Sequence, residues 1–162
     1  MSRRRVTQHP RGQVALYAVL LFPVLMLVLA LVLTVGTLEA QRARLRAQLD
    51  MAALTATQAF DFAALAAGEP PSLVAEQAEA LAREYLARNL AAVGVPSAAS
   101  VSANAQVAVV TIGEVDPIRG TVTEAPTVSI RASVPTQLPM LTLIGLDPVV
   151  SVTVTGSAAA RT

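Results

Sequence analysis

The longest apolar run of the chain lies near its start. No charged side chain occurs from Gly12 to Leu38, and the stretch Val14–Val35 is mostly Leu, Val and Ala. As a helix, at about 1.5 Å per residue, this stretch is about 33 Å long, enough for a hydrocarbon layer of about 30 Å. A secretory signal peptide has a shorter apolar region, about 7 to 15 residues, and a small-residue cleavage site. We therefore predict a transmembrane helix over residues 14–38, after a basic leader over residues 1–13.

Arginines flank the predicted span unequally. Four precede it and three follow it, at positions 3, 4, 5 and 11 and at positions 42, 44 and 46. Since positive charge favours the cytoplasmic side, we expect a cytoplasmic N-terminus and an extracytoplasmic remainder.

Two features inside the span bear on helix packing. Pro23 would normally kink a helix, although neighbouring helices can absorb the kink. Two explanations for this Pro stay open: a functional role, and the fact that Pro is common in membrane helices. Ala30 and Thr34 are small residues four apart, and Gly36 precedes Ala40 by the same interval. Such spacing lets another helix approach closely.

The next segment, residues 39–67, lacks Gly and Pro and is rich in helix formers, so the membrane helix is expected to continue outward. Arg42, Arg44, Arg46 and Asp50 indicate a solvated or headgroup-level face. Mainly small residues recur at intervals of three and four and predict a helix interface with other subunits. The members of this interface are Leu45, Leu49, Ala52, Ala56, Ala59 and Ala63.

Residues 72–162 read as a small α+β domain. The breaker 68–71 precedes Ser72, a candidate cap for an amphipathic helix that stops at Gly94. Its polar side places Glu79 before Arg83 and Glu84 before Arg88, which surface ion pairs explain without chemistry.

After Pro96 the apolar period changes from 3.6 to 2. Strands are expected over 101–105, over 107–112, over 128–134 with Pro135 as the end, and over 150–154. A helical turn is expected over 136–144 and a fraying end over 156–162. One helix over about four antiparallel strands makes the fold class α+β.

The composition excludes several function classes. Net charge is +1, with twelve basic residues, all Arg, against eleven acids, so no basic field for nucleic acid exists. There is no Cys and no Lys, and the one His, His9, precedes the span, so no catalytic triad forms outside. Glu114, Asp116 and Asp147 match no calcium loop and are better explained by turn formation. We expect no enzyme, metal or cofactor.

Both ends of the chain resemble one family. The start Arg11-Gly12-Gln13, the run through Phe22-Pro23 and the following Ala- and Gln-rich helix are similar to the N-terminus of TadE/TadG-like proteins. These are pilin-like assembly proteins of bacterial tight-adherence (Flp-type) pili. The segment 128–160, with Val134-Pro135-Thr136, also resembles that family's C-terminal pattern. About half of the chain carries the resemblance.

The resemblance implies a subunit of an envelope assembly apparatus rather than an enzyme. In pilin-like relatives a peptidase cuts after a Gly, and a Glu five residues on pairs with the new amino terminus. Gly12 would be that Gly and Gln13 the new first residue, but Tyr17 stands where the Glu is expected. Because it lacks this Glu, the chain resembles the TadG-like members of the family more than a major pilin.

These observations favour a single-pass protein of the bacterial cell membrane that acts in pilus assembly or a related secretion apparatus. Its expected partners are the lipid bilayer, other pilin-like or pilus-assembly subunits, and further copies of the same chain. The alternative is a membrane-tethered extracytoplasmic module that binds or senses a ligand.

Overall fold

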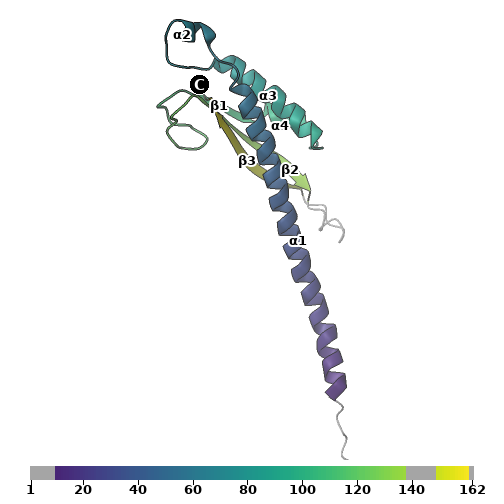
Figure 1. Cartoon of the computed structure of the whole chain (residues 1–162). Coiled ribbons are helices and arrows are strands. Elements are labelled where there is room, and N and C mark those ends of the chain that lie inside the picture. Colours follow the sequence, from purple (N-terminus) through teal and green to yellow (C-terminus); the bar gives the residue numbers. More distant parts are fainter. Residues whose placement is uncertain (1–9, 138–148, 161–162) are drawn as a thin grey trace, which may run out of the picture. The chain divides into compact units, whose positions relative to one another are not determined.

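A computed structural model of the chain describes residues 10–137 and 149–160 (Figure 1). The chain divides into two compact units, Met1–Leu38 and Glu39–Thr162. Helix α1 (Pro10–Ala56) contributes to both units, which are treated separately below. The second unit begins at residue 39, so the domain boundary expected at residue 72 is corrected: the last part of α1 belongs to the domain.

Helix α1 ends at Ala56, eleven residues before the predicted end at residue 67. Near this end the Thr55 and Thr57 hydroxyls donate to the carbonyls of Met51 (3.0 Å) and Leu54 (2.7 Å), a competition with the backbone that weakens a helix. Asp61 then starts the separate helix α2 (Phe62–Ala66), because its carboxylate accepts from the amides of Ala63 and Ala64. The predicted continuous extension over 39–67 is therefore two helices.

Helix α3 (Ala75–Ala92) confirms the predicted amphipathic helix. Its buried side consists of Ala78, Ala82, Leu86 and Leu90. Gly94 follows the helix with φ of 76°, a left-handed conformation that only Gly adopts without strain. The start differs slightly, since the N-cap is Val74 rather than Ser72 and no side chain caps it.

Helix α4 (Ala98–Ala103) occupies a segment in which alternation predicted a strand. The residues are small Ala and Ser with one Val, so the alternating pattern carried little information about burial. Val101 and Ser102 are both buried although they are adjacent, which a half-buried strand does not allow.

Within residues 10–137 and 149–160 the sheet has three antiparallel strands rather than four, in the order β1 (Gln106–Val110), β2 (Thr127–Gln137), β3 (Val149–Ala159). Pro135 does not end β2 but pairs with Ser151. Its missing N–H is tolerated because β1 pairs only with Thr127–Arg131, so β2 has a neighbour on one side there. Thr136 and Gln137 belong to β2, and the rest of the predicted helical turn over 136–144 lies outside the described residues.

The C-terminal segment is ordered further than the predicted fraying end at residue 156. Strand β3 continues to Ala159, and the Ala160 amide donates to the Pro126 carbonyl at 2.8 Å. Ala160 is buried.

The core of the second unit lies on one face of this sheet. Val128, Ile130, Ala132 and Val134 alternate along β2 and are all nearly inaccessible. The buried sides of α1 and α3 complete this core, and the opposite face of the sheet carries exposed Ser and Thr, among them Ser133 and Thr153. A mixed helix and sheet fold of class α+β is therefore confirmed.

Candidate functional site

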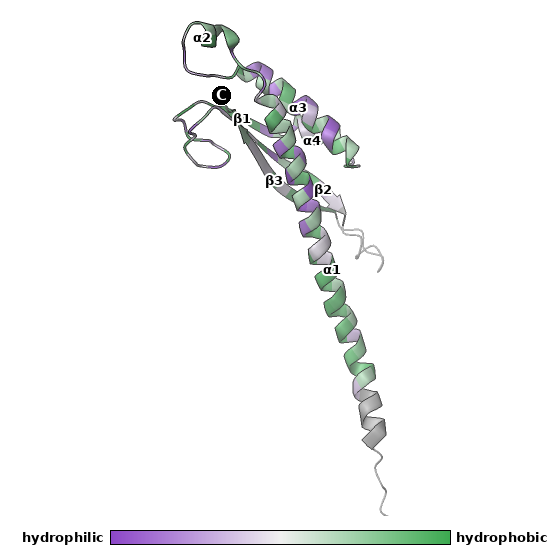
Figure 2. Cartoon of the chain, in the orientation of Figure 1, coloured by the Kyte–Doolittle hydropathy of each residue, from purple (hydrophilic) through white to green (hydrophobic). Residues whose placement is uncertain are grey.

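The exposed apolar segment of α1 is the clearest functional feature of the first unit. From Tyr17 to Val35 the large apolar side chains face outward, with Val19 72% and Phe22 61% exposed. Figure 2 shows this part of α1 as almost uniformly apolar. Among the described residues, it belongs to the one helix long and apolar enough to cross a membrane. An apolar surface of this extent is costly in water, so it indicates a membrane or another apolar partner.

The structure shows the local environment of Thr34, Gly36 and Pro23, the small and polar residues of the predicted span. The Thr34 hydroxyl donates to the Ala30 carbonyl at 2.7 Å, so it adds no unsatisfied polar group to an apolar environment. A Cβ at Gly36 would meet nothing within 4 Å, which leaves that surface open to an approaching helix. Pro23 lies inside α1, which continues on both sides of it.

Gly12 and Gln13 lie in the first turn of α1, which begins at Pro10. Cleavage between them is not tested by this placement and stays a prediction.

The predicted helix interface is corrected, because most of it is already covered by this chain. Leu49, Ala52 and Ala56 have no exposed surface, Leu45 is 6% exposed and Ala59 is 3% exposed. Ala63 alone is exposed, and it belongs to α2. Small side chains at these positions let the sheet approach α1 closely within the same chain, so this surface is not free for a partner subunit.

Gly156 of β3 is the point of closest approach to α1. An added Cβ would lie 2.6 Å from Leu49 Cβ, 2.7 Å from the Asp50 nitrogen and 2.8 Å from the Leu49 carbonyl carbon. Beside it, the Ser157 amide donates to Asp50 Oδ1 at 2.9 Å. Sequence reasoning missed this contact, and a Gly interrupting alternating Val and Thr was the available signal.

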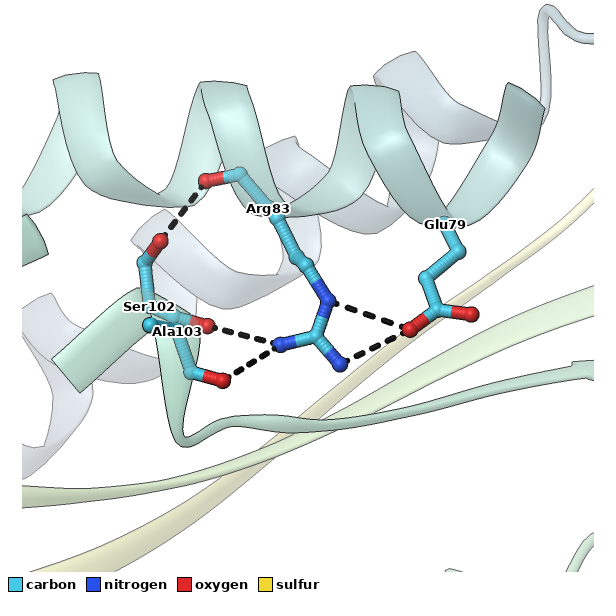
Figure 3. A network of polar contacts seen from close by, with 4 residues as sticks. All are labelled: Glu79, Arg83, Ser102 and Ala103. Atoms are coloured by element: carbon cyan, nitrogen blue, oxygen red, sulfur yellow. Dashed lines mark hydrogen bonds and ion pairs between the residues drawn. The ribbon is translucent and has the colours of Figure 1, made fainter. Parts of the chain in front are cut away.

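Arg83 connects α3 to the end of α4 (Figure 3). Its Nη1 donates to the carbonyls of Ser102 (3.1 Å) and Ala103 (2.7 Å), while Nε and Nη2 donate to Glu79 Oε1 at 3.1 and 2.8 Å. The Ser102 hydroxyl donates a hydrogen bond to the Arg83 backbone carbonyl at 3.0 Å. The predicted Glu79–Arg83 pair is therefore present, and the Arg83 guanidinium also donates to two carbonyls at the end of α4.

Asp116 holds the loop between β1 and β2 and is completely buried. One carboxylate oxygen accepts from the amides of Ile118 (2.7 Å) and Arg119 (3.2 Å), and the other accepts from the Ser129 hydroxyl. This is the side-chain geometry of an Asx turn, as the turn interpretation expects. The described residues contain no group of acids or His able to hold a metal, and Asp147 lies outside them.

A cavity of about 800 Å³ opens between α1, the turn after α3, and β2. Its lining is mixed, with Gln41, Arg44 and Gln48 from α1 opposite apolar residues that include Val95 and Val134. Such a lining suits a small or peptide-like ligand better than acid–base chemistry.

No family model, curated protein or solved structure matches the chain. The resemblance to TadE/TadG-like proteins thus rests on the residues quoted for it.

Proposed function

We propose that this chain is a single-pass bacterial envelope protein that acts in the assembly of a tight-adherence type pilus or a related secretion apparatus. The observation that carries the proposal is the uncharged, exposed helical surface from Tyr17 to Val35, in a chain whose second unit has a core of its own. The large apolar side chains from Tyr17 to Val35 are exposed, which supports anchoring in a bilayer and contact with other apolar helices.

The surroundings of the polar groups support a role in binding rather than catalysis. Among the described residues Asp116 is a fully buried carboxylate, and both of its oxygens accept hydrogen bonds that hold a turn. Arg83 donates to Glu79 and to the end of α4. Groups committed in this way are poorly suited to move protons.

The orientation is tested by labelling single cysteines, since the natural chain has none. Ala80→Cys places a thiol on the exposed side of α3. Ser2→Cys places one in the leader, and it is combined with Gly12→Leu so that the predicted cleavage after Gly12 cannot remove the label site. A membrane-impermeant maleimide added to intact spheroplasts is expected to label Ala80→Cys at once and Ser2→Cys only after lysis. The reverse pattern would contradict the proposed orientation, and release of the chain by a high-salt or alkaline wash would contradict membrane insertion.

The assembly role is tested by deleting the gene and counting surface pili by electron microscopy. Pili should disappear and return with the wild-type chain. A matched control replaces residues 14–38 by an unrelated apolar span, which keeps the anchor but removes Pro23, Ala30, Thr34 and Gly36. Failure of this control to restore pili supports specific helix contacts, whereas unchanged pili in the deletion strain would refute the assembly role.

A membrane-tethered binding module is the second candidate, and the cavity lined by Gln41, Arg44 and Gln48 favours it. A binding module needs the transmembrane helix only as an anchor, so any apolar span would serve. The chain with residues 14–38 replaced should then behave as the wild type in the same pilus assay.

A further inference from the structure

Arginines lie on two sides of α1 directly after its uncharged segment. Arg42 and Arg46 are four residues apart and therefore lie on one side of the helix, while Arg44 lies about 200° around the axis from Arg42. The first of them follows Leu38, the last residue of the uncharged segment, by four residues.

The two sides have different surroundings. Arg42 and Arg46 line a shallow groove of about 430 Å³ together with Glu39 and with Thr153, Val154 and Thr155 of β3. Val154 is buried on the core face of the sheet, so the side chains of its neighbours Thr153 and Thr155 point to the opposite face, where the Thr153 hydroxyl lies 3.0 Å from that of Ser133. The groups that can recognise an anion in this groove are therefore the two guanidinium groups. Arg44 lines the larger cavity on the other side.

The present ion pairs leave these guanidinium groups available. Arg42 Nη1 lies 2.9 Å from Glu39 Oε1, with side chains 51% and 62% exposed. Arg46 Nε is 3.9 Å from Asp50 Oδ2, and the other oxygen of Asp50 already accepts from the Ser157 amide. Exposed ion pairs of this kind contribute little to stability, so an anion that binds the guanidinium groups more strongly can displace the carboxylates of Glu39 and Asp50.

We propose that this groove binds the phosphate of an anionic phospholipid. The guanidinium forks of Arg42 and Arg46 match the oxygens of a phosphate group. The lipid rather than a free anion is favoured because the uncharged exposed helix ends just before Arg42, and juxtamembrane basic residues attract anionic headgroups. This inference rests on the proposed membrane anchoring.

The test uses the full chain in nanodiscs that contain phosphatidylglycerol and phosphatidylcholine, with retained lipids counted by native mass spectrometry. The wild-type chain should retain phosphatidylglycerol preferentially, and Arg42→Gln/Arg46→Gln should lower that preference by about tenfold or more. The matched control is Arg88→Gln/Arg119→Gln, which removes equal charge from other exposed positions, including the i,i+4 pair of Arg88 with Glu84. It should behave as the wild type.

Three results would overturn the proposal. The first is an equal lipid preference in the wild-type chain and Arg42→Gln/Arg46→Gln, with both folded by circular dichroism. The second is stabilisation of the detergent-solubilised wild-type chain by inorganic phosphate as strong as by phosphatidylglycerol, which would assign the groove to free phosphate. The third is failure of the chain to enter nanodiscs, which would refute the membrane anchor itself, whereas entry without lipid preference would refute only the groove.

Discussion

At the scale of single residues, Gly156 determines how closely the sheet approaches α1. Two of the three atoms that an added Cβ would meet belong to the backbone of α1, at 2.7 and 2.8 Å. Backbone inside a helix cannot move away like the end of a flexible side chain, so the strand and the helix would have to separate. The neighbouring bond from Ser157 to Asp50 would lengthen with them.

We therefore expect Gly156→Ala to destabilise the second unit by about 1–3 kcal/mol, the usual cost of overpacking. The measurement is the thermal unfolding midpoint of the full chain in detergent, followed by circular dichroism. Gly36→Ala is the control, since a Cβ there meets nothing within 4 Å and Ala is the better helix former. A midpoint for Gly156→Ala equal to that of the wild type would mean that Leu49 does not lie against β3.

Single residues also show what a sequence pattern can and cannot reveal. Asp116 was predictable as a turn residue, since acids next to Pro and Gly commonly form turns. Its complete burial and its bond to Ser129 were not, because they depend on the loop folding over β2 from thirteen residues away. The positions from Leu45 to Ala59 were predicted to contact other subunits, but they are buried within this chain. A spacing of three and four indicates that a helix side is covered, and it carries no information about which partner covers it.

At the scale of elements, helices and strands were predicted correctly where large apolar residues recur at a clear period, and less well where the apolar residues are small. The apolar side of α3 and the alternation in β2 and β3 combine large apolar residues with clear polar positions, and these elements are present. Residues 98–103 are small and equally compatible with a strand or a helix. Tertiary contacts favour the helix in this segment, since Arg83 of α3 donates to the carbonyls of Ser102 and Ala103 at the end of α4.

Arg83→Met tests that interpretation of α4. The substitution keeps the apolar stem but removes the donors to Ser102 and Ala103, so we expect a loss of about 1–3 kcal/mol. Hydrogen exchange of the α4 amides should accelerate more than exchange in the middle of β2. Arg88→Met is the matched control on the same helix, where an exposed pair with Glu84 is worth about 0–1 kcal/mol. Similar exchange in the two variants would show that Arg83 does not hold α4.

At the scale of the whole molecule, the boundary between the two units falls inside a helix rather than in a loop. The sequence placed it after the breaker at residues 68–71, because Gly and Pro clusters normally separate domains. The structure places it at Leu38, since the residues of α1 beyond that point are core residues of the second unit. One helix thus supplies both the uncharged segment and one wall of the domain.

This placement predicts which fragments fold. A fragment of residues 39–162 retains Leu45, Leu49, Ala52 and Ala56, all buried in the core, and lacks the exposed apolar segment. We expect it to be soluble without detergent and to unfold cooperatively. A fragment of residues 72–162 keeps α3, α4 and all three strands but exposes the apolar surface that α1 covers, including the strip beside Gly156. It should aggregate or lack a cooperative transition in circular dichroism and urea unfolding, because losing several buried side chains costs an amount comparable to the roughly 5–15 kcal/mol that stabilises an ordinary domain. Equal cooperativity in the two fragments would show that α1 is only an anchor and not part of the domain.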